Sequence, residues 1–396
     1  MHRPSRPFHR IAASRLRCAL LTCVMMACAP WATANATSAD DVVAQYANIV
    51  HATYADTLGA ARALQQSVTT FTAAPSAETL AAARSAWKAA REAYGQTEAF
   101  RFYAGPIDSA TGPEGRLNAW PMDESFVDSV KGKSKAGLIN NPKFRITKAS
   151  ISKMNERGGE ENIATGWHAV EFFLWGQDFY PASAGQRSFE DFVDGKAPHA
   201  NRRRQYLTEV TELLVDDLGA LVKAWEPGQK NYRAGFEKGG TESLRKILVG
   251  MGSLSRGELA GERLEVALAS QDQEDEHSCF SDNTHRDVVN NALGIQNVWL
   301  GHYRTLDGKD ISGPSLRDLV AASDAGVADK LSQQLNQSVQ AANGIQAPFD
   351  REIEGAKDAP GRARVQATVD SLVAQSKDIV AAANAIGIKR LTLVKP

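Results

Sequence analysis

The sequence predicts an all-α protein made of two packed helix bundles. Apolar residues recur at the 3.6-residue period of helices, and Gly and Pro recur between these segments. No segment shows the sustained two-residue alternation and β-branched enrichment of a strand. A chain of 396 residues is also long enough for two cores. We therefore expect two bundles, each of four helices and related by duplication, over residues 35–235 and 236–396.

The first 34 residues are expected to be a signal peptide. Five arginines within residues 3–17 precede an apolar run over residues 18–29, which is too short to span a membrane. Small residues alternate in ATANA, so cleavage is predicted near Ala34 or Ala36. Export to a bacterial periplasm follows. Outer-membrane association through a lipid on Cys28 stays open, although the residues around it match a lipobox poorly.

Removal of this peptide changes the charge and the cysteine content of the chain. Without the five arginines, 40 basic residues remain against 46 acidic ones, a net charge of about −6. A mildly acidic exported protein is not typical of nucleic-acid binding, so no nucleic-acid partner is expected. Of four cysteines only Cys279 would remain, which predicts a mature fold without an internal disulfide.

Helices are predicted in turn along the mature chain. The first spans about residues 41–72, and a second begins at a Ser76 cap and ends before Gly105. Residues 105–160 are rich in Gly, Pro, Asn and Asp, which indicates long loops with short helices. Further helices are predicted over residues 161–175, 200–225, 241–269, 286–303, 315–341 and 361–385.

The stretch GWHAVEFFLWGQD, residues 166–178, places two polar groups in an apolar helix. His168 and Glu171 share one face of it. A helix that is apolar on nearly all sides is buried, and a buried carboxylate must be paired or coordinated. Imidazole and carboxylate suit Zn, Fe or Mn, and the alternative is a His–Glu hydrogen bond inside a core. Neither HExxH nor HxxEH is present, so the zinc-protease helix signatures are not matched.

A weak internal sequence similarity bears on the expected duplication. GWHAVE at residues 166–171 and GELAGE at residues 257–262 share Gly, Ala and Glu in register. Glu262 then corresponds to Glu171, and Leu259 stands where His168 stands. If this similarity reflects duplication, only the first bundle kept the histidine.

A polar stripe lies on the second predicted helix. Trp87, Arg91, Tyr94, Glu98 and Arg101 fall at i, i+4, i+7, i+11 and i+14, which is one continuous face. This face is either the wall of a polar site, with Glu98 as a ligand held by Arg101, or a solvated face of salt bridges.

A third cluster is QDQEDEHSCFSDNTHRD, residues 271–287. Glu274 and His277 have the ExxH spacing of di-iron bundles, and Asp282 and His285 repeat it with a shorter acid. The two pairs sit close together around an apparent loop, whereas a di-iron site needs facing helices. A solvated acidic loop or a helix-capping network is the alternative.

Together these residues resemble the imelysin-like family, whose signature is GxHxxE. Besides GWHAVE, four blocks match it in the expected order: AWKAAREAYGQTEAFRF, GRLNAWPMDE, GMGSLSRGELAGERL and DQEDEHSCFSDNTH. The resemblance covers essentially the whole mature chain. It implies two duplicated helical bundles in an exported bacterial protein tied to iron regulation or uptake, and similarity to the metal-binding domain of periplasmic iron-uptake components. Some family members have been described as metallopeptidases.

The resemblance implies a metal site with His168, Glu171, Glu98 and Asp123 as ligands. The groups expected around these ligands or in a neighbouring cleft are Arg101, Tyr94, Glu124, Glu262, Glu274, His277 and His285. One imidazole and three carboxylates suit iron, with zinc as a further candidate. The expected partners are the metal ion and a membrane iron transporter or another periplasmic protein.

Three functions therefore remain in view. A metallopeptidase needs an open coordination position and a general base that is not itself a ligand, whereas a binding protein needs only ligands and groups that orient them. We therefore expect a periplasmic metal-binding protein for iron uptake or handling. The alternatives are a metallopeptidase that uses the GxHxxE site and a metal-free helical module that binds another ligand.

Overall fold

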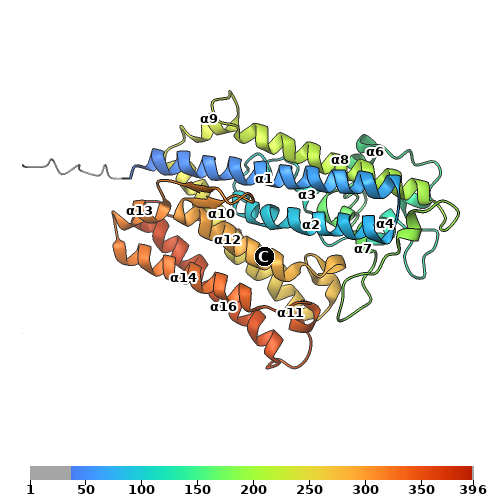
Figure 1. The fold of residues 1–396 in the computed structure, drawn as a ribbon. Helices are drawn as coiled ribbons and strands as arrows, with labels where there is room; N and C mark the ends of the chain where they lie inside the picture. The colour runs from blue at the N-terminus through green and yellow to red at the C-terminus, as the bar shows by residue number, and fades with distance from the viewer. Residues whose placement is uncertain (1–36, 395–396) are drawn as a thin grey trace, which may run out of the picture. The chain divides into compact units, whose positions relative to one another are not determined.

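Two layers of helices make up residues 37–394, the part of the chain that the computed structural model describes (Figure 1). The predicted signal peptide lies outside these residues. In one layer α1 (Ala39–Ala73) packs between α2 (Ala77–Thr97) and α8 (Ala200–Trp225), and the buried helix α7 (Gly166–Trp175) contacts both α2 and α8. In the other, α14 (Ala325–Gly344) packs between α12 (Thr284–Leu300) and α16 (Pro360–Ala385). The predicted all-α class is confirmed.

The first two long helices begin at serine caps. The Ser76 side chain accepts a hydrogen bond from the Thr79 amide at 3.1 Å, and the Thr79 hydroxyl accepts one from the Ser76 amide at 3.0 Å. This reciprocal capping box satisfies two amides that the first turn leaves free. Ser38 and Asp41 form the same arrangement at the start of α1. The predicted cap at Ser76 is therefore confirmed.

Short helices fill the segment between α2 and α8, as the Gly- and Pro-rich sequence predicts. α7 begins later than predicted, at Gly166, whose φ of +79° suits a glycine. A Cβ at Gly166 would lie 2.4 Å from the carbonyl oxygen of Leu117, so this residue lets α7 approach the preceding segment closely. The short elements are η1 (Glu98–Phe100), α3 (Glu114–Leu117), α4 (Glu124–Val127), α5 (Gly137–Asn140), α6 (Lys148–Met154) and η2 (Phe189–Phe192).

The predicted helix over residues 241–269 is continuous but not uniform. It consists of α10 (Thr241–Ser253), the π-helical segment η3 (Leu254–Glu265) and α11 (Val266–Ser270). In a π-helix the hydrogen bonds run from i to i+5, so residues five apart share a face. Glu258 and Arg263 meet in this way, with their side chains 2.9 Å apart. Nearby short elements are α9 (Tyr232–Phe236), η4 (Gln273–Asp275) and η5 (Cys279–Ser281).

The C-terminal part differs from prediction in two places. The helix predicted over residues 315–341 is divided into α13 (Leu316–Ala321) and α14, because Asp324 caps a new helix by accepting from the amide of Val327. β1 (His302–Arg304) and β2 (Asp310–Ser312) form an antiparallel hairpin that was not predicted. Strands of three residues are too short for an alternating pattern to be recognised. α15 (Asp350–Ile353) precedes α16.

α2 and α12 join the two layers at very short range. A Cβ at Gly294 would lie 2.4 Å from the carbonyl oxygen of Gln96, and one at Gly95 would lie 2.7 Å from Cβ of Asn290. Glycine at both positions therefore permits the contact. The division of the chain at residue 235 and the duplication stay predictions.

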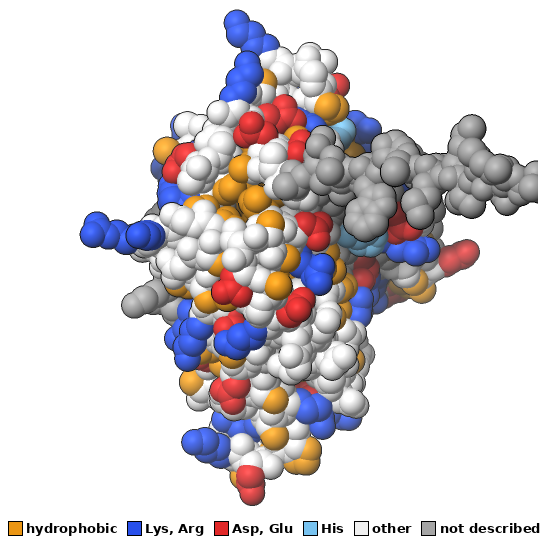
Figure 2. Space-filling model, turned by 90° about the vertical axis from the view of Figure 1, so that its left-hand side faces the viewer, with side chains coloured by type: hydrophobic (Ala, Val, Ile, Leu, Met, Phe, Trp, Pro, Cys, Tyr) orange, Lys and Arg blue, Asp and Glu red, His pale blue; other side chains and the backbone are white. Residues whose placement is uncertain are grey.

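Figure 2 shows Lys and Arg interspersed with Asp and Glu on the face at the start of α1. None of the helices within residues 37–394 combines the length and apolar character needed to cross a bilayer. Cys279 is buried and unpaired.

Candidate functional site

The GxHxxE helix carries a buried histidine–carboxylate pair. His168 Nδ1 lies 2.9 Å from Oε2 of Glu171, and the two residues are at most 1% exposed. The other oxygen of Glu171 accepts hydrogen bonds from the amide and the hydroxyl of Ser281, at 3.0 and 2.6 Å. Both oxygens of Glu171 are thus engaged, so this carboxylate orients His168.

A second buried histidine–carboxylate pair faces the first. His277 Nδ1 lies 2.9 Å from Oδ2 of Asp287, and this carboxylate also pairs with Arg91 at 3.0 Å and accepts from the Ser278 hydroxyl at 2.5 Å. The ring centres of His168 and His277 are 4.8 Å apart, with an angle of 70° between the rings. Two imidazoles from segments more than a hundred residues apart in sequence therefore meet edge to face.

The Nε2 atoms of these histidines, unlike their Nδ1 atoms, form no hydrogen bond with a carboxylate within residues 37–394. Nε2 of His168 is buried and has no hydrogen-bond partner among the described residues. Nε2 of His277 lies 3.3 Å from the side-chain nitrogen of Asn118. When Nδ1–H donates to a carboxylate, Nε2 presents its lone pair, which is the arrangement that metal-binding histidines use. The geometry therefore suits imidazole coordination.

The polar stripe of α2 forms the wall of this site. Arg91 is 1% exposed, and its guanidinium lies 5.2–5.8 Å from the ring centres of Trp87, Tyr94 and Trp167. It donates to Oδ1 of Asn118 at 2.7 Å. The stripe is therefore buried, and the alternative of a solvated salt-bridge face is wrong.

Glu98 lies at the centre of an ion-pair network that joins the layers. Its Oε2 accepts from Arg101 at 2.6 Å and from Arg263 at 2.7 Å, and its Oε1 lies 3.3 Å from the amide nitrogen of Asn118. Arg263 also pairs with Glu258 at 2.9 Å. Asn118 thus connects Glu98 to His277, while Arg101 holds Glu98 as predicted.

Burial and neighbouring charges set the protonation of the site. Burial, aided by Arg91 for His168 and Arg263 for His277, lowers the pKa of each histidine to about 3. Burial raises the pKa of Glu171 to about 8. Burial would also raise the pKa of Glu98, but Arg101 and Arg263 outweigh it and lower this pKa to about 2. Both imidazoles are therefore uncharged beside an ionised Glu98.

A pocket of ≈ 430 Å³ connects this network with solvent. His277, Asn118 and Arg101 line it together with Trp120, whose ring centre is 5.7 Å from that of His277. The remaining polar lining consists of Glu114, Glu156, Glu160 and Glu258. Four carboxylates against one guanidinium give the pocket an acidic lining, which favours the approach of cations.

Several of the predicted residues lie outside this network. Asp123 caps α4 through the amide of Ser125 at 2.9 Å, and Glu124 lies 3.4 Å from the side-chain nitrogen of Gln177. No hydrogen bond or ion pair within residues 37–394 joins Asp123 or Glu124 to the histidines. Glu262 and Glu274 are exposed and His285 is half-buried. Glu262 faces solvent because the π-helical turn aligns Glu258 with Arg263 instead.

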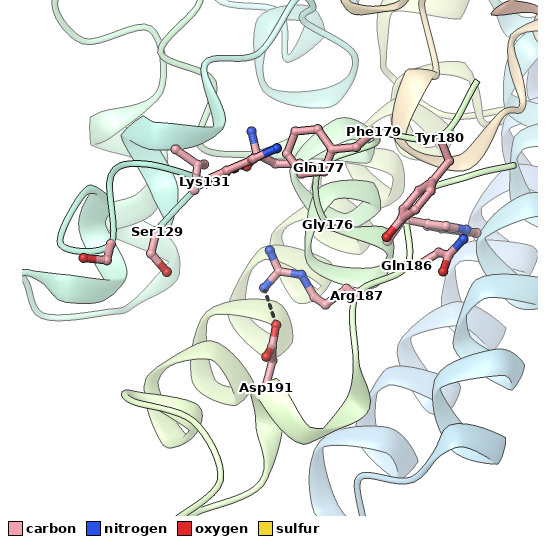
Figure 3. Close-up of a pocket in the computed structure, with 12 residues that line it drawn as sticks. Ser129, Lys131, Gly176, Gln177, Phe179, Tyr180, Gln186, Arg187 and Asp191 are labelled. Carbon is pink, nitrogen blue, oxygen red and sulfur yellow. Dashed lines mark hydrogen bonds and ion pairs between the residues drawn. The ribbon is translucent and has the colours of Figure 1, made fainter. Parts of the chain in front are cut away.

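Another pocket, of ≈ 380 Å³, lies where α7 ends (Figure 3). Gln177, Phe179 and Tyr180 line it, and Arg187 pairs with Asp191 across it at 3.8 Å. The predicted metal ligands do not line this pocket. The histidine pair is therefore the better candidate for the chemistry of the GxHxxE motif.

Sequence reasoning did not find four residues of the network: Asn118, Glu258, Arg263 and Ser281. Each lies within a block that resembles the family, which was the available signal. The spacing alone could not indicate them, because Asn118 lies in a loop, Ser281 ends the short η5, and Arg263 lies in the π-helical segment.

Comparisons with known proteins agree with this architecture. The profile of the Imelysin family matches residues 50–379. The chain is 27% identical over 315 residues to iron-regulated protein A of Synechococcus elongatus, an alignment that covers 77% of this chain and 75% of that protein.

Two solved structures share the fold. One is described as an iron-regulated protein A precursor from Parabacteroides distasonis, with a TM-score of 0.71, 21% identity and coverage of 88% of this chain and 95% of that one. The other is an imelysin-like protein from Psychrobacter arcticum, with a TM-score of 0.62, 16% identity and coverage of 89% and 96%. The match to the family profile spans most of the sequence, and the chain therefore belongs to the imelysin family.

Proposed function

We propose that this protein is an exported, periplasmic metal-binding protein that handles iron, and that His168 and His277 bind the ion. The observation that carries the proposal is the buried, unpartnered Nε2 of His168 beside His277. A buried nitrogen without a partner is costly unless a ligand occupies it. The similarity to a protein named as iron-regulated supports iron as the ion.

The donor set also supports this assignment. Two neutral imidazoles are donors that both ferrous iron and zinc accept, and the ionised Glu98, held by Arg101 and Arg263, adds negative charge to the site. Glu171 and Asp287 would orient the imidazoles rather than bind the ion, because each already accepts hydrogen bonds from other groups. The acidic pocket beside His277 would supply the route of entry.

Binding is favoured over peptide hydrolysis by the state of the carboxylates. A hydrolytic centre needs a general base within reach of a bound water. Both oxygens of Glu171 are engaged, and Glu98 is held ionised by two arginines with a pKa of about 2, so it is a very weak base. These features support a binding protein.

The test is metal binding by the mature protein and by three glutamine variants. His168→Gln and His277→Gln should each weaken the affinity for Fe²⁺ at least tenfold, about 1.4 kcal/mol, because each removes one ligand. The matched control is His302→Gln, since the His302 side chain on β1 is 38% exposed and its one ion pair within residues 37–394 is with Asp310. Titration calorimetry under anaerobic conditions measures the affinities.

Two outcomes would contradict the proposal. Wild-type protein that binds neither Fe²⁺ nor Zn²⁺ would leave two buried hydrogen-bonded pairs and favour a metal-free module. Metal-dependent cleavage of casein that is lost in His168→Gln would favour the peptidase instead.

A further inference from the structure

A second cluster of buried carboxylates lies apart from the histidine pair. One ligand oxygen from each of Asp178, Asp282 and Asp350 can be chosen so that all three lie within 4.8 Å of one another. Asp178 follows α7, Asp282 follows η5, and Asp350 begins α15, so three distant segments supply the cluster. Within residues 37–394 no other group of three or more His, Cys, Asp or Glu side chains meets this criterion.

The carboxylates of this cluster have few partners. When the carboxylates are ionised, Oδ2 of Asp178, Oδ1 of Asp282 and both oxygens of Asp350 are buried without a hydrogen-bond donor among the described residues. Only proton sharing would pair Asp178 with Asp282, or Asp350 with the buried carboxyl of Glu276, which lies beside Thr284. Glu276 is 0% exposed, and Asp178 and Asp350 are each 3% exposed. No Lys, Arg or His in the described part forms an ion pair with any of the four. Buried carboxylates in this condition are rare unless a cation is bound.

Burial and mutual repulsion raise the pKa values of two of these carboxylates. Burial, followed by the charge of Asp350, raises the pKa of Asp282 to about 8, and the same two causes raise that of Asp178 to about 6. Full ionisation at neutral pH therefore requires a positive charge at this position.

We propose that Asp178, Asp282 and Asp350 bind a Ca²⁺ ion, with the buried carboxyl of Glu276 beside them. The donors are oxygens only, without imidazole or thiolate, which selects a hard cation rather than the iron or zinc of the histidine pair. Ca²⁺ binds oxygens at about 2.4 Å, so two of its ligands stand at most about 4.8 Å apart, and one oxygen from each of the three aspartates lies within this limit of the others. Mg²⁺ demands shorter bonds in near-ideal octahedral geometry and usually takes only one or two carboxylates, whereas three carboxylates converge in this cluster.

A route from solvent reaches the cluster. Asp350 lines a pocket of ≈ 300 Å³ together with Gln271, Asp272 and Glu354. On the other side, the neighbours of Asp178 in sequence, Gln177 and Phe179, line the pocket of Figure 3. The ion can therefore enter without unfolding of the surrounding helices.

The ion would act on the histidine pair through one short segment. Residues 276–282 supply Asp282 to the cluster and Glu276 beside it, and the same segment supplies His277 and Ser281, which holds Glu171. Bound Ca²⁺ would therefore fix the loop that orients both imidazoles. The acidic 271–287 segment would in this way have a structural use that the histidine site does not explain.

The test compares Ca²⁺ binding and thermal unfolding in wild-type protein and two Asp→Asn variants. Calorimetry should give stoichiometric Ca²⁺ binding to wild-type mature protein, and Ca²⁺ should raise its Tm relative to EGTA. In Asp350→Asn, the affinity for Ca²⁺ should fall at least about tenfold and the Ca²⁺-dependent rise in Tm should vanish. In EGTA this variant should unfold at a higher temperature than wild type, because one repelling carboxylate has been removed.

Asp358→Asn is the matched control, since Asp358 is exposed and lies eight residues away in the same loop and helix region. It should bind Ca²⁺ as wild type does. Absence of Ca²⁺ binding by wild-type protein, or equal binding by Asp350→Asn and the control, would overturn the proposal. Fe²⁺ binding by Asp350→Asn, measured in the same series, separates this result from a failure of the histidine site.

Discussion

Replacing Glu98 by Gln tests whether the buried ion-pair network stabilises the fold. Glu98 is 1% exposed and accepts from Arg101 at 2.6 Å and Arg263 at 2.7 Å. The pKa of its carboxyl falls from the ordinary 4.5 to about 2 in the folded protein. At about 1.4 kcal/mol per pKa unit, this difference corresponds to about 3 kcal/mol of stability at pH 7. This value agrees with the usual loss of stability when one partner of a buried ion pair is removed, about 3–5 kcal/mol.

The sign of the pH dependence follows from the lowered pKa. The carboxylate stabilises the folded state above pH 4.5, and this stabilisation is lost as the pH falls towards 2. Glu98→Gln has no charge to lose. The free-energy difference between wild type and variant should therefore shrink from about 3 kcal/mol at pH 7 to about 1 kcal/mol at pH 3.

Urea unfolding at both pH values measures this difference. Glu92→Gln is the matched control, because Glu92 lies on the same helix and pairs with Arg286 at 2.6 Å, but its side chain is 34% exposed. An exposed pair contributes about 0–1 kcal/mol, so the control should change little. A loss below about 1 kcal/mol for Glu98→Gln at pH 7, or an equal loss at both pH values, would refute the argument.

Three further substitutions test the packing and the ion pairs elsewhere. Gly95→Ala should cost about 1–3 kcal/mol in urea unfolding, because the new Cβ would lie 2.7 Å from Cβ of Asn290, whereas Gly59→Ala meets open space on α1 and should be neutral or stabilising by up to about 1 kcal/mol. Asp128→Asn should cost about 3–5 kcal/mol, because Asp128 is 0% exposed and binds Arg203 at 2.6 Å. Equal effects of the two glycine substitutions, or a loss below about 1 kcal/mol for Asp128→Asn, would contradict these expectations.

Local sequence patterns were sufficient to predict the positions of most of the long helices. α1, α8, α12 and α16 lie within a few residues of their predicted ranges, since each has long apolar periodicity and recognisable caps or breakers. α2 begins where predicted but ends at Thr97, and only the short η1 extends it to Phe100, so the predicted end before Gly105 is wrong. The π-helical segment could not be predicted, because its sequence fits an α-helical period equally well. The hairpin was missed because three-residue strands carry too little pattern.

The candidate site was accessible to sequence reasoning only in part. His168 and Glu171 were found because they interrupt an apolar helix, and their hydrogen bond matches one of the two interpretations left open. The partnership of His277 with Asp287, rather than with Glu274 at ExxH spacing, depends on the loop between them. Spacing predicts contacts on a regular helix, whereas contacts across a loop depend on tertiary structure.

The ion pairs of the site have a mechanical consequence. Arg91 of α2 binds Asp287 of α12, and Glu98 binds Arg263 of the π-helical segment, so these bonds run from one layer of helices to the other. Near these ion pairs, α2 and α12 pack in direct contact at Gly95 and Gly294. A change in charge at this centre therefore alters the stability of the contact between the layers. Binding of the proposed ion would accordingly be thermodynamically linked to the packing of one layer against the other.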